Sequence, residues 1–135
     1  EDVTLQTSAA AALPLVRADR QRAVQVLHNL IVNAVQHSGR GTTVEVALQP
    51  ATLREASAVA FLVRDRGPGF GEGDEARVFE PFFSRRRGGT GMGLALAHRL
   101  VHDHGGEIVA ANREGGGACL RVVLPAAGDG KRATT

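Results

Sequence analysis

The sequence predicts a single α+β domain: a two-layer sandwich with a mixed, mainly antiparallel sheet and its helices on one face. Two helical segments are interspersed among short apolar segments, and two of the predicted strands follow one another without an intervening helix. This order departs from the regular strand–helix alternation of a parallel doubly wound sheet. The length of 135 residues and the hydrophobic content of 43% are sufficient for one buried core.

The first third of the chain predicts extended segments followed by a long helix. Residues 3–7 and 13–16 are short extended candidates. Asp19 is expected to cap the helix, because its carboxylate can accept the free amide hydrogens of the first turn. The apolar face follows at helical spacing and comprises Ala23, Val26, Leu27, Leu30, Ile31 and Ala34. We expect the helix to end near Ser38, with Gly39 in a left-handed cap conformation.

Strands and a second helix are predicted for the remainder. Residues 43–48 alternate, which places Val44, Val46 and Leu48 on one side of a strand. Residues 58–63 are almost continuously apolar, as in a central strand covered on both faces. A second helix is expected from about Met92 to His104. Residues 107–111 and 119–124 then predict a closing hairpin around the glycines at 115–117. The domain is predicted over residues 1–125, with a frayed tail at 126–135.

Composition argues against several classes of protein. No apolar run reaches the roughly 18 residues of a membrane span, and no signal peptide is evident, so we expect no membrane contact by this domain. A net charge of +2, scattered basic residues and the absence of Trp and Tyr do not favour nucleic-acid binding. The lone Cys119 is typical of the reducing cytoplasm, and we expect it to be a small buried hydrophobe. Because the chain opens on Glu1, we expect it to be a piece of a longer protein.

The first predicted helix carries a polar but uncharged stripe. Gln25, Asn29 and Asn33 are spaced at i, i+4 and i+8, and Gln36 and His37 follow. Amide oxygens are hard donors that suit Mg²⁺, an ion that takes few protein ligands and completes its shell with water and phosphate oxygens. The alternative is a helix whose amides only face solvent.

A glycine-rich loop, Asp65-Arg-Gly-Pro-Gly-Phe70, follows the apolar strand directly. A carboxylate in such a position is costly to bury without a partner, and an ionised Asp can only accept hydrogen bonds. Asp65 is therefore suited to receive the exocyclic amine of adenine, while Gly67 and Gly69 permit close approach of the backbone. A plain turn between two elements is the alternative.

A second glycine-rich segment, residues 88–94, opens the second predicted helix. Its backbone N–H groups would lie at the positive end of the helix dipole, which suits an anion such as phosphate. The spacing matches neither a P-loop nor a dinucleotide fingerprint. A hinge or a helix cap is the alternative.

In order, these motifs resemble the N, G1, F and G2 boxes of sensor histidine kinases. The matching segments are Asn29-Leu-Ile-Val-Asn33-Ala, Asp65-Arg-Gly-Pro-Gly69, Phe79-Glu-Pro-Phe-Phe83 and Gly89-Thr-Gly-Met-Gly93-Leu. The resemblance covers residues 1–125 and implies the Bergerat ATP-binding sandwich, with ATP and Mg²⁺ as ligands. It implies Asn29 and Asn33 as catalytic residues, Asn33 as the metal ligand, and Asp65 as the adenine-binding acid. The nucleotide-binding set that it implies is His37, Asp65, Gly67, Gly69, Phe70, Phe82, Phe83, Arg85, Gly89, Thr90, Gly91, Met92, Gly93 and Leu94.

Two departures from the family pattern and one difference from its hydrolysing relatives stand out. Gln36 occupies a position where many relatives carry a phosphate-binding Lys, so an arginine of the short lid, such as Arg85, is a candidate for the missing charge. Ala118 and Cys119 stand where a Thr is frequent. Asn29 stands where hydrolysing relatives place a general-base Glu, and a neutral amide is a poor base.

The resemblance implies phosphoryl transfer to an acceptor outside this chain, because none of its five histidines has the flanking sequence of a phosphoacceptor. The implied partners are a dimerisation and phosphoacceptor domain of the same protein and the receiver domain of a response regulator. The isolated domain is expected to be monomeric and the full-length protein homodimeric and cytoplasmic, anchored to a membrane or not. Two alternatives stay open: an anti-sigma-factor serine kinase and a non-catalytic nucleotide-gated module.

Overall fold

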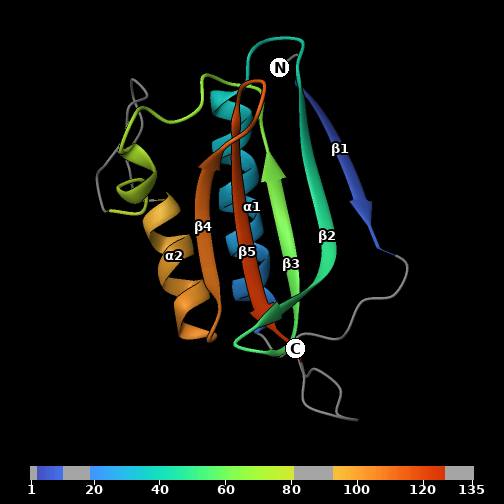
Figure 1. Ribbon diagram of the computed structural model, residues 1–135. Helices are drawn as coiled ribbons and strands as arrows, with labels where there is room; N and C mark the ends of the chain where they lie inside the picture. The colour runs from blue at the N-terminus through green and yellow to red at the C-terminus, as the bar shows by residue number, and fades with distance from the viewer. Residues whose placement is uncertain (1–2, 11–18, 81–92, 127–135) are drawn as a thin grey trace.

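The computed structural model describes residues 3–10, 19–80 and 93–126. In this part of the chain, two helices pack on one face of a five-stranded sheet (Figure 1). The strands are β1 (Thr4–Ala9), β2 (Thr43–Leu53), β3 (Ala56–Arg64), β4 (Glu107–Asn112) and β5 (Ala118–Pro125); the helices are α1 (Arg20–His37) and α2 (Gly93–Asp103). A short 3₁₀ turn, η1 (Asp74–Ala76), was not predicted. The predicted two-layer sandwich is confirmed.

The strand order in the sheet is β1-β2-β3-β5-β4. Only the β1–β2 pair is parallel within the described sheet; β2–β3, β3–β5 and β4–β5 are antiparallel. The mixed, mainly antiparallel sheet is thus as predicted. β3 lies at the centre, and residues 58–63 are all buried, in agreement with the apolar run that predicted a central strand. None of the described helices is long and apolar enough to cross a membrane.

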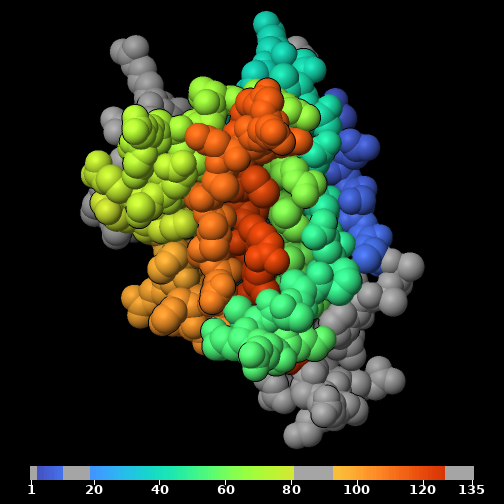
Figure 2. All heavy atoms as spheres, in the orientation of Figure 1, coloured from blue at the N-terminus to red at the C-terminus, as the bar shows by residue number. Residues whose placement is uncertain are grey.

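The main core lies between the sheet and the helices. Strand alternation directs Val44, Val46 and Phe61 toward this side, where they meet Leu30 of α1 and Leu100 of α2. Leu30 has no exposed surface, as its place in the helical apolar repeat predicts. The other sheet face carries a second, smaller apolar cluster around Ala60, Leu62 and Val123; Figure 2 shows this face.

The two ends of α1 illustrate one correct and one incorrect prediction. Asp19 caps the helix as expected, since its carboxylate accepts from the backbone N–H groups of Gln21 and Arg22. The helix ends at His37, but the left-handed cap predicted at Gly39 is wrong. The cap residue, Ser38, is extended, with φ −77° and ψ 146°. The left-handed residue is Gly41, with φ 79°, because the chain turns tightly into β2 there.

β2 continues to Leu53, five residues beyond the predicted strand. This extension passes through Pro50, which has no backbone N–H to donate. β1 ends opposite Leu48, so the far part of β2 is an edge of the sheet, where a proline is tolerated. Alternation alone did not reveal this extension.

The closing elements follow the prediction within one or two residues. α2 ends at Asp103, and Gly105, with φ 76°, stops it. β4 and β5 form the predicted hairpin around glycines 115–117, and Pro125 is the last residue of β5. Met92, the extended candidate at 13–16 and the tail at 127–135 lie outside the described residues.

Candidate functional site

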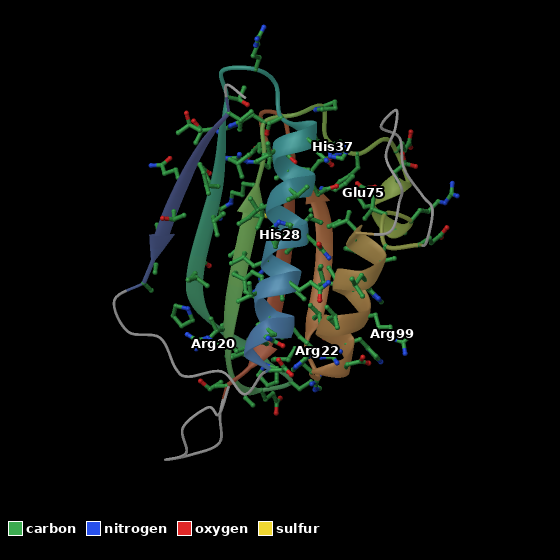
Figure 3. The ribbon with its side chains drawn as sticks, turned by 180° about the vertical axis from the view of Figure 1, so that it is seen from behind. Arg20, Arg22, His28, His37, Glu75 and Arg99 are labelled. Carbon is green, nitrogen blue, oxygen red and sulfur yellow. The ribbon has the colours of Figure 1, made fainter. Side chains whose placement is uncertain are left out.

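Three segments meet at one end of the sandwich: the end of α1, the loop after β3 and the turn between β4 and β5. Figure 3 places His37 at this end of α1, whereas Arg20 and Arg22 lie at the opposite end. The contact between α1 and the loop is backbone to backbone: a Cβ added at Gly67 would lie 2.0 Å from the carbonyl oxygen of His37. Only glycine fits at this position, because a methyl group would overlap the helix end.

Asp65 is the buried acid of this site, with 5% of its surface exposed. Its Oδ1 accepts hydrogen bonds from the backbone N–H groups of Gly67 and Ala118, both at 3.0 Å. Its own backbone N–H donates to the Ala118 carbonyl oxygen at 2.8 Å. Within the described part of the chain, the second carboxylate oxygen, Oδ2, has no hydrogen-bond partner. The carboxylate is therefore held rigidly by one oxygen and offers the other as an acceptor.

The turn between β4 and β5 supports Asp65 from the other side. Gly117 has φ 100°, and a Cβ there would lie 2.1 Å from the Asp65 carbonyl oxygen. Arg113 donates from Nη1 to the same carbonyl oxygen at 3.1 Å and from Nη2 to Glu45 Oε1 at 3.3 Å. The backbone of Asp65 is therefore fixed by an arginine that is itself held by an ion pair.

The predicted polar stripe of α1 is half-buried at Asn29, Asn33 and His37. Asn29 Nδ2 donates to the Gly93 carbonyl oxygen at 3.2 Å, which joins α1 to the first residue of α2. The His37 Nδ1 lies 2.8 Å from the Asn33 carbonyl oxygen. Because a carbonyl oxygen only accepts, this bond requires the proton on Nδ1 and leaves Nε2 as the acceptor of the neutral ring.

One polar atom near this site has no partner. The Ser38 hydroxyl oxygen is buried and makes no hydrogen bond within the described structure. Ser38 directly follows His37, whose carbonyl oxygen abuts Gly67. A buried hydroxyl without a hydrogen-bond partner is unfavourable, and either a water molecule or a polar group of a ligand can supply the missing hydrogen bond.

Several residues of the site were not predicted. The loop is contacted by Arg113, Gly117 and Asn112, whereas Glu45 holds Arg113 and Ser38 follows the helix residue that abuts Gly67. None of these residues was predicted to belong to the site. For Asn112 and Arg113, the sequence offered one signal: both lie at the end of a predicted strand, next to a glycine-rich turn. Which loop they contact depends on the strand order of the sheet, and local patterns do not give that order.

Other predicted residues lie outside the described part of the chain: Phe82, Phe83, Arg85, Gly89, Thr90, Gly91 and Met92. Of the remaining members, Gly93 begins α2 and Leu94 packs against the core. Phe79 of the same motif is described, and its ring lies 5.2 Å from the ring of His98 on α2. The structure therefore brings together Asp65, Gly67 and His37, and links Asn29 to the start of α2.

Cys119 lies on the open face of the sheet and is half-buried, not fully buried as predicted. Its neighbour across the β3–β5 pair is Arg64. Burial raises the pKa of the Cys119 thiol above its ordinary value, although Arg64, Arg113 and Arg121 partly offset this effect. The protonated thiol is a poor nucleophile, in keeping with the structural role expected for it.

Comparison with known proteins places these features in a family. Residues 18–128 match the family model described as histidine kinase-, DNA gyrase B-, and HSP90-like ATPase. The sensor histidine kinase ZraS of Escherichia coli K12 is 37% identical over 125 residues, which are 92% of this chain and 26% of ZraS. The chain thus spans about a quarter of the length of this curated relative.

Solved structures of histidine kinases are also similar to this chain. The catalytic domain of the histidine kinase ThkA superimposes with a TM-score of 0.79 at 30% identity, over 93% of this chain and 80% of that one. Full-length ShkA in complex with AMPPNP superimposes with a TM-score of 0.75 at 31% identity, over 93% of this chain and 26% of that one.

Proposed function

Because this chain belongs to the histidine kinase-, DNA gyrase B- and HSP90-like ATPase family, as an ATP-binding catalytic domain of the sensor histidine kinase type, we propose that it holds Mg-ATP between α1 and the loop at 65–70. We further propose that it donates the γ-phosphoryl group to a histidine of another domain. The observation that carries the proposal is the buried Asp65 carboxylate, which is fixed through Oδ1 and, among the described residues, has no partner at Oδ2. The ATP analogue in the ShkA complex supports a nucleotide as the ligand.

Recognition of the base rests on Asp65. Its Oδ2 accepts a hydrogen bond from the exocyclic amine of adenine. A 6-oxo purine would instead place a carbonyl oxygen, which cannot donate, against the carboxylate oxygen. Gly67 lets the backbone of the loop lie directly against the His37 carbonyl oxygen at the end of α1, because no Cβ separates them. Ser38 has a buried hydroxyl that finds no partner among the described residues, which fits a polar ligand or a water molecule near this position. Phe70 completes the loop, and His37 lies at the helix end beside it.

The phosphates are assigned to the side where α1 meets α2. Asn33 has an amide oxygen of the kind that Mg²⁺ prefers and would hold the ion; bound Mg²⁺ neutralises phosphate charge. Asn29 keeps the start of α2 against α1 through Gly93. The unpaired N–H groups at the start of α2 lie at the positive end of the helix dipole and would favour the negative charge of the phosphates.

The domain transfers the phosphoryl group and does not pass it to water. Asn29 stands one helical turn before Asn33, where a general base would activate water, and its amide has no such capacity. Its Nδ2 is already engaged with Gly93. The acceptor is a histidine of the dimerisation and phosphoacceptor domain of the same cytoplasmic, homodimeric protein, and the phosphoryl group then passes to a response regulator receiver domain.

The folded domain is expected to bind Mg-ATP in a calorimetric titration but to hydrolyse it slowly. Without a general base, turnover should be at least a thousandfold below the roughly 10 per second of ordinary enzymes. The measurement is ADP release by the purified domain over hours at saturating ATP. Absence of binding heat from folded protein would contradict the proposed function, and rapid ADP release would contradict the role given to Asn29.

A further inference from the structure

We propose that Asn112, the last residue of β4, is a positioning residue for the purine site: its side chain clamps the backbone of Phe70 and so fixes the far end of the adenine loop. This inference rests on the proposed function, because it concerns the same site. Asn112 makes no contribution to base recognition itself; it acts through the loop.

The clamp consists of two hydrogen bonds between one side chain and one residue. Asn112 Oδ1 accepts from the backbone N–H of Phe70 at 2.6 Å, and Asn112 Nδ2 donates to the Phe70 carbonyl oxygen at 3.0 Å. A carboxamide offers one acceptor and one donor in a plane, as a peptide group does. The side chain thus pairs with Phe70 in the way that a neighbouring strand would pair with it.

The backbone beside the clamp is shaped to admit it. Gly69 has φ 79°, and a Cβ at this position would lie 2.7 Å from Asn112 Oδ1. Gly69 was predicted to shape the adenine pocket, and the structure gives a specific reason for a glycine here. It allows the amide of Asn112 to approach the loop.

The β4–β5 hairpin holds the loop at both ends. At the first end, Asp65 pairs with Ala118 and its carbonyl oxygen accepts from Arg113. At the second end, Phe70 pairs with Asn112. Figure 2 shows the orange hairpin turn against the light-green segment that follows β3.

A loop of six residues held at both ends retains one conformation, whereas release of one end opens others. If only a fraction of the molecules has the loop in place, the apparent nucleotide affinity falls to that fraction of its full value. The loss of two hydrogen bonds corresponds to a fall on the order of tenfold. The clamp is therefore expected to set ATP affinity from outside the pocket.

The test compares four proteins at a temperature where circular dichroism shows each of them to be folded: the unchanged domain, Asn112→Ala, Asn112→Asp and Glu114→Ala. Asn112→Asp keeps the size of the side chain and the acceptor for the Phe70 N–H, but it replaces the donor by a second acceptor facing the Phe70 carbonyl oxygen. Glu114→Ala is the matched control, since Glu114 is exposed in the same turn. Mg-ATP affinity is measured by calorimetry, and hydrogen exchange of the Phe70 amide by NMR.

We expect both Asn112 variants to bind ATP about tenfold more weakly than the unchanged domain. The Phe70 amide should exchange faster in Asn112→Ala, and Glu114→Ala should match the unchanged domain in both measurements. Unchanged ATP affinity in the folded Asn112 variants, or equal loss in Glu114→Ala, would overturn the inference while leaving the proposed function intact. Failure of the unchanged domain to bind ATP would instead refute the proposed function, and this inference with it.

Discussion

Asp65→Asn is expected to weaken ATP binding by about 100-fold or more while the domain stays folded. The Asn side chain keeps a carbonyl oxygen, which can accept from the N–H groups of Gly67 and Ala118 as Oδ1 does now. The second position becomes an NH₂ group, so a donor faces the amine of adenine. Calorimetric titration with Mg-ATP measures the loss, and a thermal melt checks the fold.

Two comparisons make this result specific. Gln36→Ala changes an exposed amide on the neighbouring helix and is expected to weaken binding far less. Inosine triphosphate carries a carbonyl oxygen where ATP carries the amine, so Asp65→Asn should shift the preference toward it. Comparable losses in Asp65→Asn and Gln36→Ala, with no shift toward inosine triphosphate, would remove Asp65 from base recognition.

Gly67→Ala is expected to have the second large effect. The added methyl group would lie 2.0 Å from the His37 carbonyl oxygen, so the loop or the end of α1 must move. Such overpacking against backbone destabilises a domain by about 1–3 kcal/mol or more. ATP binding should also fall below detection, because both displaced segments carry predicted ligand contacts. Urea denaturation and ATP titration at low denaturant separate these two effects.

Gly39→Ala is the matched control. Gly39 lies in the turn after α1, and a Cβ there would meet only the methyl group of Thr42 at an ordinary 3.6 Å. We expect a stability change within about 1 kcal/mol and unchanged ATP binding. Normal ATP affinity in Gly67→Ala would show that the close approach of α1 to the loop is not needed for the site.

Local patterns predicted the elements well where a single physical effect determines them. Asp19 caps α1 because its short carboxylate can accept the free N–H groups of the first helical turn. The continuous apolar run at 58–63 is buried in the central strand β3. Alternation failed beyond Leu48, where β2 continues through Pro50. That continuation depends on where the neighbouring strand β1 ends.

In the site, too, local features were predicted and features that depend on strand pairing were not. Asp65 was identified because a carboxylate directly after a buried strand is unusual, and the glycines beside it indicated close backbone approach. The sequence did not show that Oδ1 is held by backbone N–H groups while Oδ2 is left for a ligand, because one of the donors, Ala118, lies 53 residues further along the chain. Asn112 and Arg113 were missed for the same reason: their contacts with the loop arise from the pairing of β5 with both β3 and β4.

A crystal structure of this domain with a non-hydrolysable ATP analogue and Mg²⁺ is the decisive measurement. We predict the purine beside Asp65, with its exocyclic amine about 3 Å from Asp65 Oδ2 and the metal ion on the amide oxygen of Asn33. A nucleotide bound elsewhere, with Oδ2 of Asp65 facing only water, would contradict the assignment of this pocket.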